Sequence, residues 1–238
     1  MKHKYPIMLN VEGRRCLVVG GGSVAERKIR SLLSVGALVA VLSPEVTEGL
    51  VEMACRGEVV LYRQTFSLNR MSEILSVTTS PFMLVVAATN VAEVNTQVYE
   101  AAISQGLLVN VVDQPELSSF IAPSVIRRGK LVIAVSTGGA SPSAARKIAK
   151  ELEHTYGTEY EVYFDFLSEV RLKVQKQIAD KETRQILFRE MLEWDVLTRI
   201  RSSTFELWKD ELYTLIDKEP GLSAIAAFGR QVQRGGVT

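Results

Sequence analysis

The fold is indicated by residues 16–25, which read Cys16-Leu17-Val18-Val19-Gly20-Gly21-Gly22-Ser23-Val24-Ala25. The apolar start is typical of a buried strand, and the glycines and the last alanine have the spacing G-x-G-x-x-A. Gly20 permits a tight turn, Gly22 lets the backbone approach a pyrophosphate, and Ala25 lets the following helix pack closely. Because free N–H groups at a helix N-terminus attract anions, this stretch predicts a dinucleotide site. The alternative is a glycine turn that binds no ligand.

The alternation of buried strands and helices continues through the first half of the chain. Strands are predicted at residues 16–19, 38–42, 58–62, 82–88 and 107–112. Helices are predicted between them at residues 24–35, 46–55, 69–75 and 91–104. Continuous apolar strands separated by helices indicate a parallel sheet that is covered on both faces. We therefore expect an α/β fold, with a doubly wound, Rossmann-type parallel sheet over residues 1–113.

The next part of the chain changes to a pattern that suggests a hairpin. Residues 119–126 and 131–136 are strand-like. A helix follows, and its start is marked by Ser141 as the N-cap and Pro142 at the first helical position. We therefore expect a small α+β segment over residues 114–150.

The remainder, residues 151–238, is predicted to be an all-helical domain. The expected helices cover residues 159–180, 183–200 and 203–218, and residues 229–238 are expected to form a frayed tail. Apolar positions in this region are Phe164, Leu167, Val170, Leu172 and Val174.

Composition limits the classes of function. The chain has 238 residues, with 28 basic against 27 acidic side chains and two cysteines. Balanced charge gives no reason to expect nucleic acid, and so few cysteines are typical of a reducing compartment. No apolar leader and no apolar run of membrane-spanning length is present, so we expect a cytoplasmic protein with no membrane partner. The charge is unevenly distributed, however: residues 1–150 carry 16 basic and 11 acidic side chains, and residues 151–238 carry 12 and 16.

Two further strand ends are expected to lie beside the glycine loop. The second strand ends at Ser43 and Pro44, where Ser43 could hydrogen-bond a ribose; the acidic residue expected there is absent, and Glu45 follows two positions later. Because no arginine follows to bind a 2′-phosphate, NAD is favoured over NADP. Thr89 and Asn90 follow the fourth strand, and they suit a nicotinamide ribose or, equally, a strand-to-helix turn with Asn90 as its N-cap.

Asp113 ends the fifth predicted strand, in the sequence Asn110-Val111-Val112-Asp113. Ligand crevices of open α/β sheets lie at this edge, where a carboxylate can accept a proton from a bound substrate. The alternative is that Asp113 only caps the turn that it forms with Gln114 and Pro115.

A second loop of small residues precedes the helix that begins at Pro142. Its sequence, Ser136-Thr137-Gly138-Gly139-Ala140-Ser141, offers hydroxyls and backbone N–H groups to an anion. The cations around it are Arg127, Arg128, Lys130, Arg146, Lys147 and Lys150. A polyanionic small molecule would suit this loop, and the predicted contacts are Ser136, Thr137, Gly138, Gly139, Ser141, Arg146 and Lys147. The alternative is a solvated basic helix face.

No metal site is predicted from the sequence. The histidines, His3 and His154, are far apart along the chain. No spacing of cysteines, histidines and carboxylates resembles a set of metal ligands.

Five motifs resemble one known family and occur in the same order. They are LVVGGGSVAERK at residues 17–28, AATN at 87–90, NVVD at 110–113, SFIAPS at 119–124 and STGGASP at 136–142. Each motif is generic alone, but five in order are specific. The chain resembles the precorrin-2 dehydrogenase/sirohydrochlorin ferrochelatase family, the N-terminal module of siroheme synthase, in a stand-alone form. The resemblance extends from Tyr5 to the helical region near residue 200.

The resemblance implies a homodimer in which the Rossmann domain is followed by a dimerisation segment and by a helical domain that helps to enclose a tetrapyrrole. In the family, NAD⁺ takes a hydride from precorrin-2 to give sirohydrochlorin, and some members then insert Fe²⁺ to make siroheme. The catalytic aspartate of the family corresponds to Asp113. Its cofactor contacts correspond to Gly22, Ser23, Val24, Ser43 and Pro44.

Two other functions are alternatives to this one. A non-catalytic Rossmann protein that senses NAD(H) would need neither Asp113 nor the loop at residues 136–142. A short-chain dehydrogenase is disfavoured because its Tyr-x-x-x-Lys pair is missing. The tyrosines without a lysine four residues later are Tyr62, Tyr99, Tyr156, Tyr160 and Tyr163.

Overall fold

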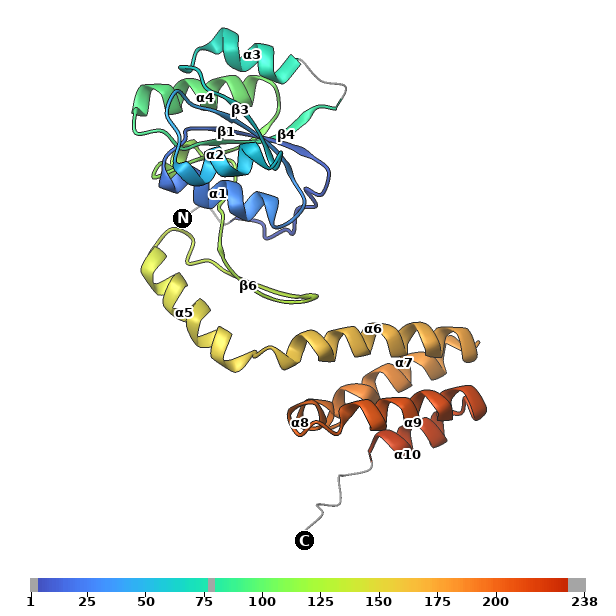
Figure 1. Cartoon of the computed structure of the whole chain (residues 1–238). Coiled ribbons are helices and arrows are strands. Elements are labelled where there is room, and N and C mark those ends of the chain that lie inside the picture. Colours follow the sequence, from blue (N-terminus) through green and yellow to red (C-terminus); the bar gives the residue numbers. More distant parts are fainter. Residues whose placement is uncertain (1–3, 77–79, 231–238) are drawn as a thin grey trace. The chain divides into compact units, whose positions relative to one another are not determined.

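The computed structural model describes residues 4–76 and 80–230, which form two compact units. The first unit contains Met1–Ala122 and Gly138–Ala140, and the second contains Pro123–Thr137 and Ser141–Thr238 (Figure 1). The division into three parts at residues 113 and 150 stays a prediction. Within the described residues, no helix is long and apolar enough to cross a membrane.

The first unit is built on a five-stranded parallel sheet with the strand order β3-β2-β1-β4-β5. Its strands are β1 (Arg15–Val19), β2 (Leu38–Leu42), β3 (Val59–Tyr62), β4 (Phe82–Ala87) and β5 (Leu108–Val111). Val19 pairs with Leu42 on one side and with Ala87 on the other. The strand order reverses between β1 and β4, and ligands of open α/β sheets bind at such a reversal. The predicted doubly wound fold is confirmed.

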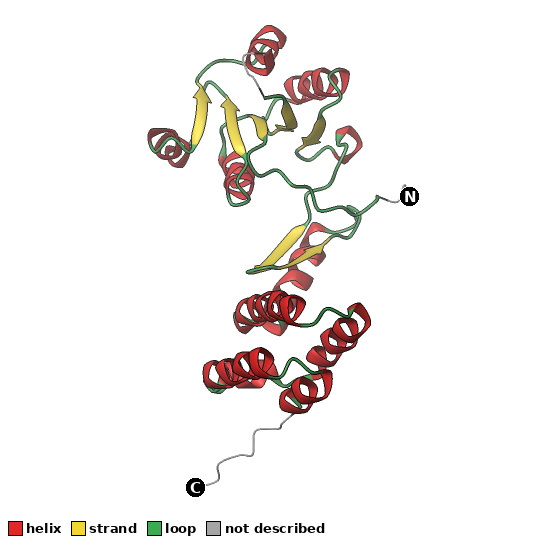
Figure 2. Cartoon of the chain, turned by 90° about the vertical axis from the view of Figure 1, so that its right-hand side faces the viewer, coloured by secondary structure: helices red, strands yellow, loops and turns green. Residues whose placement is uncertain are grey.

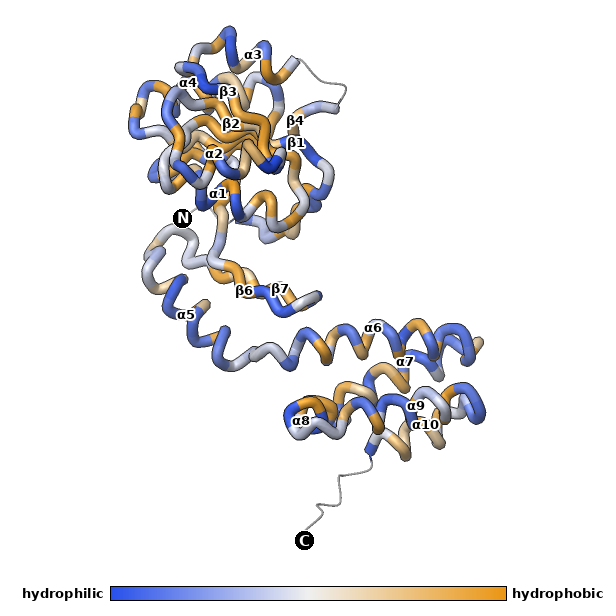
Figure 3. The backbone as a smooth tube through the Cα atoms, viewed as in Figure 1, coloured by the Kyte–Doolittle hydropathy of each residue, from blue (hydrophilic) through white to orange (hydrophobic). Residues whose placement is uncertain are grey.

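Helices cover both faces of this sheet because alternate side chains of a strand point to opposite faces. The helices are α1 (Ser23–Leu33), α2 (Glu48–Cys55), α3 (Leu68–Ser76) and α4 (Ala92–Ser104). α1 and α2 pack on the face of Cys16 and Val18, whereas α3 and α4 pack on the face of Leu17 and Val19. Figure 2 shows helices on both sides of the strands, and Figure 3 shows the hydrophobic strands between them. Loops at the carboxyl edge are therefore carried by a packed core.

The strand predicted over residues 119–126 is wrong in its first half, because β6 begins at Ser124. A short 3₁₀ turn over Pro115–Leu117 leads into irregular chain that runs beside the edge strand β5. There Ser119 bonds to Val109 of β5 through both its backbone N–H and its hydroxyl. Side-chain hydrogen bonds thus replace part of a strand ladder at this edge.

The second unit contains a hairpin of β6 (Ser124–Arg128) and β7 (Leu131–Val135), which pair antiparallel. Gly129 closes the turn with a φ of 54°, in the left-handed region that favours glycine. α5 (Pro142–Thr155) packs against both strands. The Ser141 hydroxyl accepts a hydrogen bond from the N–H of Ala144 at 3.1 Å, so the predicted N-cap is confirmed.

A helical bundle completes the second unit. Its helices are α6 (Glu159–Gln177), α7 (Lys181–Glu190), α8 (Val196–Arg201), α9 (Phe205–Lys218) and α10 (Leu222–Gly229). The helix predicted at 183–200 is wrong as one element, because a 3₁₀ turn over Met191–Glu193 and an extended Trp194 divide it. The predicted tail at 229–238 begins inside α10, and its residues 231–238 lie outside the described residues.

Candidate functional site

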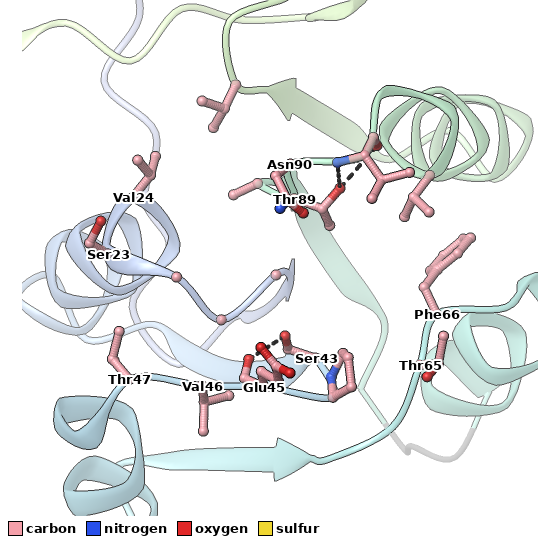
Figure 4. Close-up of a pocket in the computed structure, with 18 of the residues that line it drawn as sticks. Ser23, Val24, Ser43, Glu45, Val46, Thr47, Thr65, Phe66, Thr89 and Asn90 are labelled. Atoms are coloured by element: carbon pink, nitrogen blue, oxygen red, sulfur yellow. Dashed lines mark hydrogen bonds between the residues drawn. The ribbon is translucent and has the colours of Figure 1, made fainter.

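A pocket of about 700 Å³ lies in the first unit, between the loops that follow the strands (Figure 4). The predicted site residues that line it are Gly20, Gly22, Ser23, Val24, Ser43, Pro44, Thr89, Asn90 and Asp113. The structure therefore brings together all the residues predicted to bind the cofactor and the predicted catalytic aspartate. Their roles stay predictions at this point.

The glycine loop is held tightly at its first two glycines and is open at the third. Gly20 has a φ of 122°, and a Cβ on it would lie 2.3 Å from the carbonyl oxygen of Ala88. A Cβ on Gly21 would lie 2.1 Å from the carbonyl oxygen of Glu45. A Cβ on Gly22 would meet no described atom within 4 Å. The packing of the protein therefore explains Gly20 and Gly21, whereas the open space beside Gly22 suits a close-lying ligand.

The N-terminus of α1 provides hydrogen-bond donors to this space. Gly22 is the N-cap of α1, and within the described residues no side chain caps the helix there. The first N–H groups of a helix have no partner inside the helix, and they favour anions. Ser23 and Val24, at the start of the helix, line the pocket. These donors, together with the space that a Cβ at Gly22 would fill, fit the pyrophosphate of a dinucleotide.

The wall after β4 is fixed by Asn95, a buried residue of α4 that is only 5 % exposed. Its side-chain oxygen accepts from the N–H of Thr89 at 3.2 Å and from the Thr89 hydroxyl at 2.8 Å. Its side-chain nitrogen donates to the carbonyl oxygen of Thr89 at 3.0 Å. The prediction of Asn90 as N-cap is wrong, because Val91 has that position and Asn90 lines the pocket.

The wall after β2 is tied to both neighbouring helices. The hydroxyl of Ser43 donates to the carbonyl oxygen of Glu45 at 2.6 Å, so a ribose would find its oxygen as an acceptor (Figure 4). The N–H of Thr47 donates to the carbonyl oxygen of Gly21 at 3.0 Å. The Thr47 hydroxyl donates to the carboxylate of Glu26 at 2.5 Å, and Arg30 donates to the same carboxylate. The hydrogen bonds from Thr47 and Arg30 hold the pKa of Glu26 below its ordinary value.

Replacing Glu26 with Gln is expected to weaken NAD binding by about threefold to tenfold, because it weakens the link between Thr47 and α1. Folding lowers the pKa of Glu26 from its ordinary value of 4.5. The ionised carboxylate therefore stabilises the folded state fully at pH values above 4.5. This stabilisation is lost as the pH falls through the lowered pKa. Calorimetric titration with NAD⁺ at neutral pH, and urea unfolding over a range of pH, measure the two effects.

Glu58→Gln is the matched control for this prediction. Arg56 lowers the pKa of Glu58 in a pair on the surface, and Glu58 does not line the pocket. Glu58→Gln is expected to lower the free energy of unfolding with the same dependence on pH as Glu26→Gln. It is expected to leave the affinity for NAD⁺ unaltered. Equal losses of NAD affinity in both variants would show that the Glu26 link is not the cause.

Asp113 lies in a strained turn at the edge of the pocket. Its φ is 61°, a left-handed conformation that is uncommon for residues other than glycine. Its side chain is exposed, and it forms no hydrogen bond with another described residue. The N-cap of the following 3₁₀ turn is Gln114, without a side-chain cap. The carboxylate of Asp113 is therefore available to a ligand. The alternative, in which Asp113 caps the turn with Gln114 and Pro115, is not observed.

The second predicted loop does not contribute to the lining of this pocket. Gly138 and Gly139 have φ values of 63° and 92°, and no described atom lies within 4 Å of a Cβ built on either. The Thr137 hydroxyl accepts from the N–H of Ser141 at 3.1 Å and donates to its carbonyl oxygen at 3.0 Å, so this pair closes the loop. Ser136 is exposed.

The cations around that loop differ in their partners. Arg128 donates to the carbonyl oxygens of Glu153 and Tyr156, and its side chain is mostly buried, so it holds the end of α5. Lys130 pairs with Asp165 at 2.8 Å. Arg146 and Lys147 are exposed on α5, and the Lys147 pair with Glu151, at 4.0 Å, is loose and solvent-exposed. These two side chains remain suited to an anionic ligand.

Some pocket residues were not singled out from the sequence. They are Gly21, Glu45, Val46, Thr47, Thr65, Phe66, Ala88, Val91, Val94 and Val112. Thr65 and Phe66 follow β3, and the sequence signal for them is their place after a strand of a parallel sheet, whose carboxyl ends share one edge. No group of three metal-binding side chains is found within residues 4–76 and 80–230, and His3 lies outside them.

Comparison with known proteins agrees with this geometry. Residues 7–124 match the family model described as "Putative NAD(P)-binding". Siroheme synthase of Nitrosococcus oceani is 39% identical over 195 residues, which are 82% of this chain and 40% of that protein. Siroheme synthase of Psychromonas ingrahamii is 45% identical over 148 residues, 62% of this chain and 30% of that protein. The chain thus spans less than half the length of these relatives.

A solved structure covers more of the fold. The structure of SirC, precorrin-2 dehydrogenase, matches 90% of this chain and 100% of its own chain, with a TM-score of 0.72 and 30% sequence identity. Because this match spans the whole of SirC, it includes more than the dinucleotide-binding part. NAD is the cofactor that the pocket and these matches support. The chain belongs to the precorrin-2 dehydrogenase/sirohydrochlorin ferrochelatase family, as the resemblance in its motifs indicated.

Proposed function

We propose that the protein oxidises precorrin-2 to sirohydrochlorin, with NAD⁺ as the hydride acceptor. One observation carries this proposal: Asp113 lines the same pocket as the glycine loop. A carboxylate that forms no hydrogen bond with another described residue, beside a dinucleotide site, suits an oxidation that releases a proton. The similarity to a precorrin-2 dehydrogenase supports the choice of substrate.

Different residues of the pocket would bind different parts of the cofactor. Bound NAD⁺ supplies a hydride acceptor. Gly22, Ser23 and Val24 would hold the pyrophosphate through backbone N–H groups at the N-terminus of α1. Ser43 would accept a hydrogen bond from a ribose hydroxyl, and Thr89 would contact the nicotinamide ribose from a turn that Asn95 keeps fixed.

Asp113 would act as the general base of the oxidation. The oxidation removes a hydride and a proton from precorrin-2, and with NAD⁺ as the acceptor the products would be sirohydrochlorin, NADH and H⁺. The proton would pass to the carboxylate of Asp113, and from there to water, because this side chain is exposed.

The tetrapyrrole is proposed to be held through its carboxylates. The loop at residues 136–141, in which Ser136 and residues 138–140 are exposed, and the exposed cations Arg146 and Lys147 would bind them. We also propose a homodimer. Its support is the two-stranded sheet of β6 and β7, in which each strand has one edge without a strand partner among the described residues, so that a second copy could pair there. Val125 of this hairpin is 44% exposed, although α5 packs against both strands.

Insertion of Fe²⁺ into sirohydrochlorin is a second candidate activity, with Fe²⁺ as a substrate. The exposed carboxylate of Asp113 favours it, because a base must take the pyrrole N–H protons as the metal enters. A non-catalytic sensor of NAD(H) is less well supported, since nothing in sensing requires an exposed carboxylate at the edge of the pocket.

The test is an anaerobic assay with precorrin-2 and NAD⁺, in which NADH formation and the spectrum of the macrocycle are followed together. Stoichiometric NADH and sirohydrochlorin are expected. A second assay supplies sirohydrochlorin with Fe²⁺ or Co²⁺, and metal insertion there would make the enzyme bifunctional. NAD binding without oxidation of precorrin-2 would favour the sensor.

A further inference from the structure

The turn that carries Asp113 is closed by a long backbone hydrogen bond, from the N–H of Gln114 to the carbonyl oxygen of Val111 at 3.4 Å, and by one buried hydroxyl group. Asp113 lies between the end of β5 and the 3₁₀ turn, and Ser118 follows that turn. Ser118 is 8% exposed, although serine is usually a surface residue. A buried hydroxyl must form hydrogen bonds to offset its loss of water, so its partners indicate what it does.

The partners of Ser118 lie on both sides of Asp113. Its oxygen accepts from the N–H of Val111 at 2.9 Å. Its hydroxyl lies 3.2 Å from the carbonyl oxygen of Val111 and 3.1 Å from that of Gln114, within donating distance of both. One side chain thus joins the residue that ends β5 to the residue that follows Asp113.

The conformation of Asp113 depends on this closure. The N–H of Val112 donates to the carbonyl oxygen of Ala87 at 2.9 Å, which fixes the chain just before Asp113 to β4. A left-handed φ is uncommon in a residue other than glycine, and it persists only where the surroundings impose it. Val112 and Ser118 impose it from the two sides of Asp113.

We propose that Ser118 is a positioning residue for Asp113, which it holds in the geometry that proton transfer requires. The inference rests on the proposed role of Asp113 as the base. Ser118 does not line the pocket, so it acts through the turn and not on the substrate. Loss of the hydroxyl would allow Asp113 to leave its left-handed conformation, and its carboxylate would move away from the reacting atom.

Ser119 provides a matched control, because it bonds to β5 in the same way. Its oxygen accepts from the N–H of Val109 at 2.8 Å, and its hydroxyl donates to the carbonyl oxygen of Val109 at 3.1 Å. Both of these bonds join Ser119 to Val109, which lie further from Asp113 along the chain than Val111 and Gln114 do, so neither closes the tight turn from Val111 to Gln114. If serines 118 and 119 only protect the edge of the sheet, their removal should have similar effects.

The experiment compares Ser118→Ala, Ser118→Thr, Ser119→Ala and Asp113→Asn in the full chain, with precorrin-2 and NAD⁺ as substrates. Ser118→Ala is expected to lower kcat by about tenfold to a hundredfold, as misplaced catalytic groups do, and to leave the KM for NAD⁺ within about twofold. Ser118→Thr keeps the hydroxyl and should recover most of kcat. Ser119→Ala should keep kcat within about threefold of the wild type, since its bonds are ordinary neutral ones.

Thermal unfolding of each variant separates a folding defect from a positioning defect. Equal losses of kcat in Ser118→Ala and Ser119→Ala, or no recovery in a folded Ser118→Thr, would overturn the positioning role. Full activity of Ser118→Ala beside an inactive Asp113→Asn would overturn it too, and would leave the role of Asp113 intact. Full activity of Asp113→Asn would instead overturn the role of Asp113 as the base.

Discussion

Replacing Asp113 with Asn is expected to reduce the turnover of precorrin-2 oxidation by about a hundredfold to ten-thousandfold, the usual contribution of a general base. Asn has the shape of Asp but no basic oxygen for the proton that leaves the macrocycle. It is also among the residues that best tolerate a left-handed φ, so the turn at 61° should persist. NAD affinity should stay unaltered, because the donors for the pyrophosphate lie on α1.

The measurements are single-turnover oxidation of precorrin-2 and calorimetric titration with NAD⁺. Glu116→Gln is the control, since it removes an exposed carboxylate from the adjacent 3₁₀ turn without touching the pocket. It should behave like the wild type. If both variants lose activity equally, the local negative charge is responsible and not proton transfer; if neither does, another group is the base.

The sheet of the first unit could be predicted because its signals are local. Residues such as Leu17 and Val18 are apolar in succession because both faces of β1 are covered, and this pattern is hard to mistake. The glycine loop could be predicted for a similar reason. The φ of Gly20 excludes most other residues, so the turn requires a glycine that can be recognised in the sequence.

Elements stabilised by distant contacts could not be predicted in this way. Phe120 and Ile121 are residue types that favour strands, yet the hydroxyl of Ser119 forms hydrogen bonds of the kind that the backbone of a strand would form. In α6, the apolar positions noted from the sequence included Leu172, which is 60% exposed, and did not include Phe166, which is buried with Val170 and Val174. Which helix face is buried depends on the neighbouring helices, which a single segment does not reveal.

The residues of the candidate site also differ in whether the sequence could predict them. Ser43, Thr89 and Asp113 follow strands of a parallel sheet, so their meeting at one edge follows from topology. Thr47 and Phe66 lie further into their loops, and they reach the pocket only because those loops fold back over the edge. The positions of Asn95 and Ser118 depend on hydrogen bonds with pocket turns that the sequence pattern does not encode.

A methyl group added at Gly20 or at Gly22 should have opposite consequences. Gly20→Ala would place Cβ 2.3 Å from the carbonyl oxygen of Ala88, at a φ of 122°. Left-handed strain and overpacking each cost about 1–3 kcal/mol, so we expect destabilisation by roughly 2–6 kcal/mol and loss of the first unit's cooperative fold. Gly22→Ala meets no described atom within 4 Å, and its φ of −79° is ordinary, so its melting temperature should stay close to the wild type.

Gly22→Ala should nevertheless weaken NAD binding by at least about tenfold, because its methyl group enters the space that lets the backbone approach the pyrophosphate. Thermal unfolding and calorimetric titration of the two variants measure both effects. An unfolded Gly22→Ala, or one that binds NAD⁺ as tightly as the wild type, would contradict this assignment. Comparing Gly20→Ala with Gly22→Ala tests the site more directly than either variant alone, because both add one methyl group to the same loop. If only Gly22→Ala folds and loses its ligand, then the open side of the loop is the binding side.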